Sequence, residues 1–207
     1  AAAKKASKEN DIVVFDGNND AGKKLLLTGS GRCNIGNVNN DLSKYHSSNK
    51  ELIKKIINDK NFDKVNNFFK EIGLVLKDKN GYLYPYSEKS SSVLSCLKNS
   101  LDVDFRFNTY VENIKRKDNK FIINGEVFDK VIITTGGLSY PKTGSTGEGF
   151  HLAKAFGHKV TNLNPSLMAL ETNTGLEKEW SGTRCEVNVS SYIVGRKIKE
   201  EHGELQL

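Results

Sequence analysis

The sequence predicts an α/β fold in which helices alternate with short, buried strands. Residues 1–7 (AAAKKAS) read as the last turns of a helix, and the apolar run at 12–15 reads as the strand that follows. A glycine-rich turn comes directly after that strand. A second apolar run, at 131–135, is short and continuous, as in parallel sheets, and ends on Gly136-Gly137.

The middle of the chain shows helical spacing followed by a hairpin signal. Apolar residues recur every three or four positions over 50–72, and Asn61 or Asp63 is expected to divide this stretch into two helices. Asn80-Gly81 predicts a tight turn between strands at 74–77 and 82–84.

The next segment predicts a helix that starts at a serine cap and is followed by three strands. Ser87 is the expected N-cap of the helix. The strands are expected at 103–107, 109–116 and 120–123, and Asn124-Gly125 predicts another hairpin turn before Val127 and Phe128.

The expected secondary structure changes from helix to strand in the last third of the chain. A short helix is expected at 149–156, with Gly157 as its stop. Beyond Pro165 the pattern favours strands, such as 185–194, so we place a domain boundary near 164–166. The missing initiator Met and the strand-like pattern at the final residues suggest a fragment of a longer chain.

Composition limits the classes of function. The chain has 207 residues and a net charge of +6, but its lysines are scattered among acids, so nucleic-acid binding is unlikely by this criterion. No apolar run reaches the roughly 20 residues of a membrane span, and no signal peptide is visible. Three isolated cysteines favour a reducing, cytoplasmic setting. The four histidines have no metal-ligand spacing, and no metal site is expected.

The stretch FDGNNDAGKK at 15–24 nearly matches the phosphate-binding pattern G-x-x-x-x-G-K-[ST]. Lys24 stands where a hydroxyl should bind magnesium, so a nucleotide hydrolase is the weakest of three hypotheses. Asp16 at the tip of the strand suits another chemistry, because such an acid binds the ribose of a dinucleotide in Rossmann units. Taken alone, residues 16–18 fit an ordinary turn better than a ribose site.

Two longer motifs change that balance. Residues 22–34 read GKKLLLTGSGRCN and residues 134–149 read TTGGLSYPKTGSTGEG, with GYLYPYS at 81–87 between them. In order and spacing they resemble the aminoacetone oxidase-like family, also called NAD(FAD)-utilising dehydrogenases. The resemblance covers nearly the whole chain.

The resemblance implies a Rossmann-like FAD-binding domain of the glutathione-reductase type over 1–164, and the start of an inserted β-rich domain over 165–207. It implies an FAD-dependent oxidoreductase that passes a hydride or electrons to a small organic substrate or oxygen, with NAD(P)H as a candidate donor. The catalytic side chain and the oligomeric state stay open. The cofactor-binding residues it indicates are Asp16, Lys24, Thr28, Gly29, Ser30, Gly31, Arg32, Cys33, Asn34, Val111, Thr135, Gly136, Gly137 and Tyr140.

Each of these residues also has a structural interpretation. Gly29 and Gly31 allow a close backbone approach to a phosphate or flavin, or form a plain turn. Arg32 suits a pyrophosphate or an ordinary salt bridge. Cys33 is expected to be a buried thiol or to pack against the cofactor. The alternative function is a non-catalytic nucleotide- or FAD-binding module, including one associated with RNA.

Overall fold

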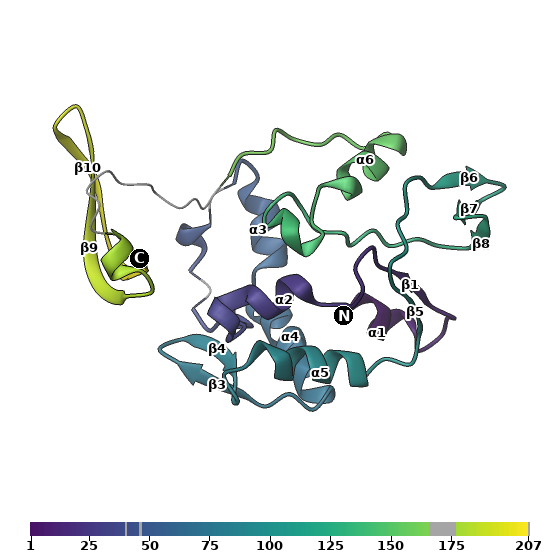
Figure 1. The fold of residues 1–207 in the computed structure, drawn as a ribbon, viewed down its shortest axis with the longest axis horizontal. Helices are drawn as coiled ribbons and strands as arrows, with labels where there is room; N and C mark the ends of the chain where they lie inside the picture. Colours follow the sequence, from purple (N-terminus) through teal and green to yellow (C-terminus); the bar gives the residue numbers. More distant parts are fainter. Residues whose placement is uncertain (40, 46, 166–176, 207) are drawn as a thin grey trace. The chain divides into compact units, whose positions relative to one another are not determined.

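The computed structural model describes residues 1–39, 41–45, 47–165 and 177–206 (Figure 1). The chain divides into two compact units, Ala1–Thr161 and Asn162–Leu207. We describe each unit by itself.

A short parallel strand pair begins the first unit, as the α/β prediction requires. Helix α1 (Ala2–Ala6) precedes β1 (Val13–Phe15), and β1 pairs in parallel with β5 (Asp104–Arg106). The strands expected at 12–15 and 103–107 are thereby confirmed. The polar residues that follow β1 come out at the carboxyl end of this pair, the usual location of ligand sites in α/β sheets.

A three-stranded antiparallel sheet of order β2-β4-β3 forms from residues far apart in sequence: β2 (Gly36–Asn37), β3 (Leu76–Lys79) and β4 (Tyr82–Pro85). Asn80 and Gly81 join β3 to β4 with φ angles of 54° and 85°, as the predicted turn requires. Helix α2 (Lys23–Leu27) and a tight turn at Thr28–Gly31 precede this sheet.

The predicted helical stretch 50–72 does contain two helices, but the break lies earlier than expected. Helix α3 (Lys50–Ile56) ends before Asn58, and α4 (Asp59–Glu71) begins after it. The Asn58 Oδ1 accepts the backbone N–H of Asn61 at 3.0 Å, so Asn58 caps α4 and Asn61 lies inside its first turn.

Helix α5 (Ser90–Asn99) begins later than the expected cap at Ser87, which is therefore a correction. The chain first makes a turn in which Glu88 has a φ of 52° and its N–H donates to the Pro85 carbonyl. The Ser87 hydroxyl instead bonds the Ser92 hydroxyl at 2.8 Å.

The core of the unit lies beneath α5. Cys33, Leu74 and Val93 form its buried centre, and the side chains packed against it are Leu25, Ile35, Phe69, Leu76, Cys96 and Leu97. Val93 is 0% exposed. The core therefore ties α2, α4, α5 and the β2-β4-β3 sheet together.

A small meander follows β5: β6 (Lys115–Lys117), β7 (Lys120–Ile123) and β8 (Glu126–Phe128), with the expected turn at Asn124-Gly125. The strand expected at 109–116 is wrong over most of its length, because 109–114 run without a ladder partner among the described residues. Arg106 ties the meander to the parallel pair by its ion pair with Glu126, and the Phe15 and Phe128 rings meet edge to face.

The apolar run at 131–135 is not a strand, which corrects a second expectation. It pairs with no strand in the described part of the chain, and Ile132 is 63% exposed. The chain continues through a turn at Pro141–Thr143 into α6 (Glu148–Ala155), and Gly157 has a φ of 82° just beyond the helix end, as predicted.

The second unit contains α7 (Glu177–Trp180) and the long hairpin of β9 (Arg184–Ile193) and β10 (Arg196–Gln206). The predicted strand at 185–194 is confirmed.

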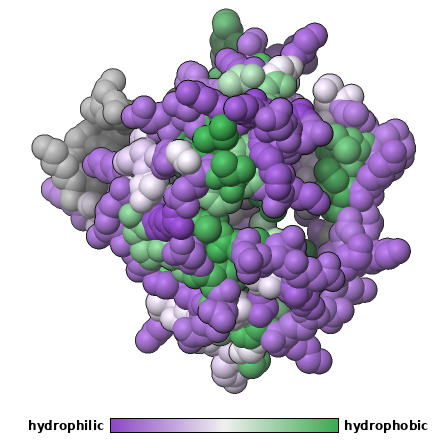
Figure 2. Space-filling model, turned by 90° about the vertical axis from the view of Figure 1, so that its right-hand side faces the viewer, coloured by the Kyte–Doolittle hydropathy of each residue, from purple (hydrophilic) through white to green (hydrophobic). Residues whose placement is uncertain are grey.

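Among the described residues, none of the helices is both long and apolar enough to cross a membrane. Hydrophilic residues cover most of the face shown in Figure 2, and hydrophobic ones gather near its centre.

Val93 offers a direct test of the core. We expect Val93→Ala to lower the free energy of unfolding by about 1–3 kcal/mol, because it removes fully buried methyl groups and leaves a cavity. Val127→Ala is the matched control: Val127 is 63% exposed, so its loss should stay within about 0.5 kcal/mol. Urea denaturation measures both, and equal losses would contradict this placement of the core.

Candidate functional site

Asp16 lies at the end of β1 in a hydrogen-bonded turn. Its Oδ1 accepts the backbone N–H of Asn18 at 2.9 Å and the Asn18 side-chain amide at 3.0 Å. The backbone carbonyl of Asp16 accepts the N–H of Thr109 at 3.0 Å. The hydrogen bonds described at this carboxylate all end on Oδ1, so Oδ2 is available to accept from a ligand hydroxyl.

The distant motif at 134–149 meets this turn. The Asn18 Nδ2 donates to the Thr143 carbonyl at 3.2 Å, and Lys24 Nζ donates to the Ser139 carbonyl at 2.6 Å. Gly144 packs so tightly against Asn18 that a Cβ there would lie 2.6 Å from Nδ2. The structure therefore brings the two glycine-rich segments together at the end of the parallel strand pair.

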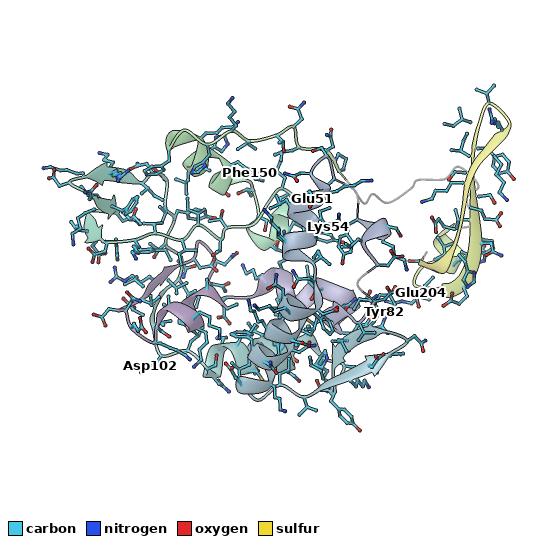
Figure 3. The ribbon with its side chains drawn as sticks, turned by 180° about the vertical axis from the view of Figure 1, so that it is seen from behind. Glu51, Lys54, Tyr82, Asp102, Phe150 and Glu204 are labelled. Atoms are coloured by element: carbon cyan, nitrogen blue, oxygen red, sulfur yellow. The ribbon has the colours of Figure 1, made fainter. Side chains whose placement is uncertain are left out.

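The second motif is also folded onto itself. Gly136 has a φ of 81°, and a Cβ on it would lie 3.0 Å from the buried Ser145 Oγ. A Cβ on Gly149, at the start of α6, would lie 2.3 Å from Thr135 Oγ1. Phe150 packs beneath Gly137 and is labelled in Figure 3. Instead of the end of a strand, Thr135–Gly137 thus form a largely exposed, irregular segment that packs against α6.

Tyr140, in the second motif, combines a left-handed backbone conformation with an exposed side chain. It has left-handed backbone angles (φ 55°, ψ 65°), and its carbonyl accepts the N–H and the hydroxyl of Thr143 at 3.0 and 2.7 Å. Its side chain is 71% exposed. A non-glycine residue in this region is strained, and such strain clusters at functional sites.

The loop at 28–34 is the other predicted cradle. Gly29, Ser30, Gly31 and Cys33 all have positive φ, and a Cβ on Gly29 would lie 3.0 Å from the Asn34 N. Ser30 and Cys33 carry a strain of about 1–3 kcal/mol each. The hydrogen bond from Cys33 N–H to the Thr28 carbonyl, at 2.9 Å, closes the loop.

The side chains of this loop point in different directions. Cys33 is buried in the core against Leu74 and Val93, so its thiol is a packing group. The Asn34 Oδ1 accepts the Gly36 N–H at 3.1 Å, which fixes the turn into β2. Arg32 is half-buried, and its guanidinium carbon lies 5.5 Å from the centre of the Tyr84 ring.

Val111 is half-buried in the stretch 109–114 that has no ladder partner among the described residues. Its neighbour Tyr110 was not predicted for the site, yet its ring covers the Asp16 turn: a Cβ on Gly17 would lie 2.9 Å from that ring. Asn18 and Tyr84 were missed as well. Asn18 lies within the stretch FDGNNDAGKK and Tyr84 within GYLYPYS. Both motifs were noted in the sequence, but the sequence does not show which distant residues Asn18 and Tyr84 contact.

The arrangement suits an elongated, anionic ligand with hydroxyl groups. Asp16 offers an acceptor, and Lys24 and Arg32 offer positive charge. The 28–34 loop and the segment 135–140 are largely exposed. Within the described ranges, His, Cys, Asp and Glu form no cluster that could hold a metal ion. The magnesium-dependent P-loop hypothesis fits less well, since Lys24 bonds a backbone carbonyl and α2 has only five residues.

Comparison with known proteins places the chain in a family and shows several curated relatives. Residues 1–192 match the family described as HI0933-like protein Rossmann domain. The chain is 30% identical over 213 residues to the 3-dehydro-bile acid delta(4,6)-reductase of Clostridium scindens, which covers 100% of this chain and 52% of that protein.

Two further relatives share another name. The ribosomal RNA dihydrouridine synthases of Haemophilus influenzae and Escherichia coli are 28% and 24% identical over 180 and 176 residues. Each match covers 81% of this chain and 44% of the relative. The chain therefore spans about half the length of the curated relatives it matches.

The contact between Gly144 and Asn18 can be tested against a matched glycine. Gly144 and Gly125 have φ angles of 90° and 88°, but a Cβ on Gly125 meets open space. Alanine at either position adds backbone strain of about 1–2 kcal/mol. Only Gly144→Ala also displaces the Asn18 amide, whose hydrogen bonds contribute about 0.5–1.5 kcal/mol each.

We therefore expect Gly144→Ala to lose more free energy of unfolding than Gly125→Ala, as measured by urea denaturation. Equal losses would mean that Asn18 does not join the two segments.

Proposed function

The chain belongs to the HI0933-like Rossmann-domain family, and from this membership we propose that the protein is an FAD-dependent oxidoreductase. The observation that carries the proposal is the meeting of the two glycine-rich segments at Asp16. In Rossmann units an acid at this place binds the adenosine ribose. Within the family, our finer assignment is to the aminoacetone oxidase-like members.

The residues at the site fit FAD by their chemistry. Asp16 Oδ2 would accept from the ribose hydroxyls, and Arg32 would meet the negative charge of the pyrophosphate or the flavin. Gly29, Ser30 and Gly31 would offer backbone N–H groups, whereas the Thr28 N–H donates to the Leu25 carbonyl and fixes the start of the loop. Thr135, Gly136, Gly137 and Tyr140 would cover the cofactor in the manner of the glutathione-reductase type. We assign the Val111 backbone to the adenine edge.

The chemistry that bound FAD supplies is the transfer of a hydride or of two electrons. This chain would bind and orient the cofactor. A delta(4,6)-reductase and a dihydrouridine synthase, by their names, both deliver hydrogen to an unsaturated organic molecule. We therefore propose a carbon–carbon double bond in an organic substrate as the acceptor and NAD(P)H as the donor.

Two further assignments belong to this proposal. The free cysteines of the described chain, Cys33, Cys96 and Cys185, fit a cytoplasmic protein. The hairpin of the second unit fits the start of an inserted β-rich domain.

The visible spectrum of the purified full-length protein tests the class. We expect flavin absorption bands that bleach when NADH or NADPH is added without oxygen, and that return when an unsaturated acceptor is supplied. A protein that carries flavin but is reduced by neither donor would favour the non-catalytic module. A colourless protein that does not take up added FAD would contradict the proposal.

Asp16 can be tested with two graded variants. Asp16→Asn keeps an oxygen for Asn18 but removes the charge, and we expect FAD affinity to fall about 5- to 10-fold. Asp16→Ala removes the acceptor and should cost about 10- to 150-fold. Titration calorimetry with FAD measures both. Asp11→Ala, an exposed acid before the same strand, is the control and should bind normally.

If the affinity for FAD is the same in both Asp16 variants as in the unmodified protein, Asp16 is not the ribose ligand.

A further inference from the structure

Three tyrosines lie along one face of the β2-β4-β3 sheet. On β4 the side chains of Leu83 and Pro85 are buried, so Tyr82 and Tyr84 lie on the opposite face, because successive side chains of a strand alternate. Tyr86 continues that alternation just beyond the strand. Tyr82 is 47% exposed and Tyr86 is 69% exposed, and Tyr82 is labelled in Figure 3.

Cations alternate with these rings on the same face. The register pairs Lys77 with Tyr84 and Lys79 with Tyr82. Lys77 Nζ lies 5.5 Å from the centre of the Tyr86 ring, and the Arg32 guanidinium carbon lies 5.5 Å from that of Tyr84. We call Tyr82, Tyr84, Tyr86, Lys77, Lys79 and Arg32 the tyrosine face.

The tyrosine face carries a positive excess. Glu88 is the acid beside it, at 2.6 Å from Lys77 Nζ. That hydrogen bond lowers the pKa of Glu88, and the charges of Lys77, Lys79 and Arg32 lower it further. One carboxylate is therefore within electrostatic reach of three cations. Asp78 belongs to the other side of β3, opposite Leu83, and its Oδ1 accepts the Gly81 N–H.

Exposed rings at alternate strand positions, with cations between them, match the surfaces on which proteins stack unpaired bases. On such sheets each aromatic ring takes one base, and lysine or arginine meets the phosphates. A steroid would use the rings but would leave the cations without a partner. The scattered lysines of the sequence argued against nucleic acid, but the folding of the sheet gathers Arg32, Lys77 and Lys79 on one face.

We propose that the tyrosine face binds single-stranded RNA. The inference rests on the proposed function and names its substrate class, because Arg32 belongs both to this face and to the 28–34 loop assigned to FAD. A base stacked near Tyr84 would lie beside that loop. Two relatives of the chain are named for a reaction of ribosomal RNA, which agrees with this choice of ligand.

Fluorescence anisotropy of a labelled, single-stranded RNA oligonucleotide with the full-length protein tests the proposal. Tyr82→Ala and Tyr86→Ala should each weaken binding about 5- to 150-fold, whereas phenylalanine at either position should preserve it. Tyr192→Ala is the matched control: Tyr192 is 61% exposed but lies on β9 of the second unit. Neither Tyr82 nor Tyr86 is among the residues assigned to FAD.

Salt and strandedness give two further readouts. Affinity should fall with salt, and Lys79→Ala should reduce the slope of log K against log salt by about 0.7, whereas Lys115→Ala on β6 should leave it unchanged. Duplex RNA of the same length should bind more weakly, because its paired bases cannot stack on side chains.

Three results would overturn the proposal: no RNA binding, equal binding by the double variant Tyr82→Ala/Tyr86→Ala, or equal binding of duplex RNA. Flavin absorption in the same preparation separates the two claims. A protein that carries flavin but does not bind RNA would support the proposed function and contradict RNA binding by the tyrosine face. A protein that binds RNA but takes up no FAD would contradict the proposed function and support RNA binding.

Discussion

The amide of Asn18 is the contact on which the candidate site depends. It donates to the carboxylate of Asp16 and to the carbonyl of Thr143, so it holds two segments together that are separated by most of the first unit. The parallel pair of β1 and β5 has only three residues per strand and could not fix this geometry by itself. Gly144 has no side chain because the amide occupies that space.

Local signals in the sequence predicted local structure well. The turns at Asn80-Gly81 and Asn124-Gly125 and the helical spacing over 50–72 depend on neighbouring residues, and the structure contains all three. The strand expected at 131–135 is absent, and the strand expected at 109–116 is absent over 109–114. An apolar run becomes a strand only when another strand supplies its ladder. Composition cannot show whether such a partner exists.

At the candidate site, too, the sequence indicated individual residues but not the long-range contacts between them. The motifs indicated Asp16, Lys24 and the glycines. In the structure Lys24 contacts the second motif directly, and Asp16 is linked to it through Asn18. The contacts of Asn18, Tyr110 and Tyr84 could not be predicted, since each joins residues far apart in the chain. Cys33 shows why a motif alone does not assign a role to each of its side chains. The 28–34 loop has an exposed backbone at Gly29 and Ser30, but its Cys33 side chain is buried in the core.

That combination explains how the 28–34 loop can hold a strained shape. Positive φ at Ser30 and Cys33 costs free energy, and the burial of the Cys33 side chain among Leu74 and Val93 offsets it. With Cys33 fixed below, the adjacent Arg32 is directed to the Tyr84 ring. The loop therefore presents its backbone to the proposed cofactor and its cation to the tyrosine face. One short segment would therefore contact both of the proposed ligands, the cofactor through its backbone and the RNA through the Arg32 side chain.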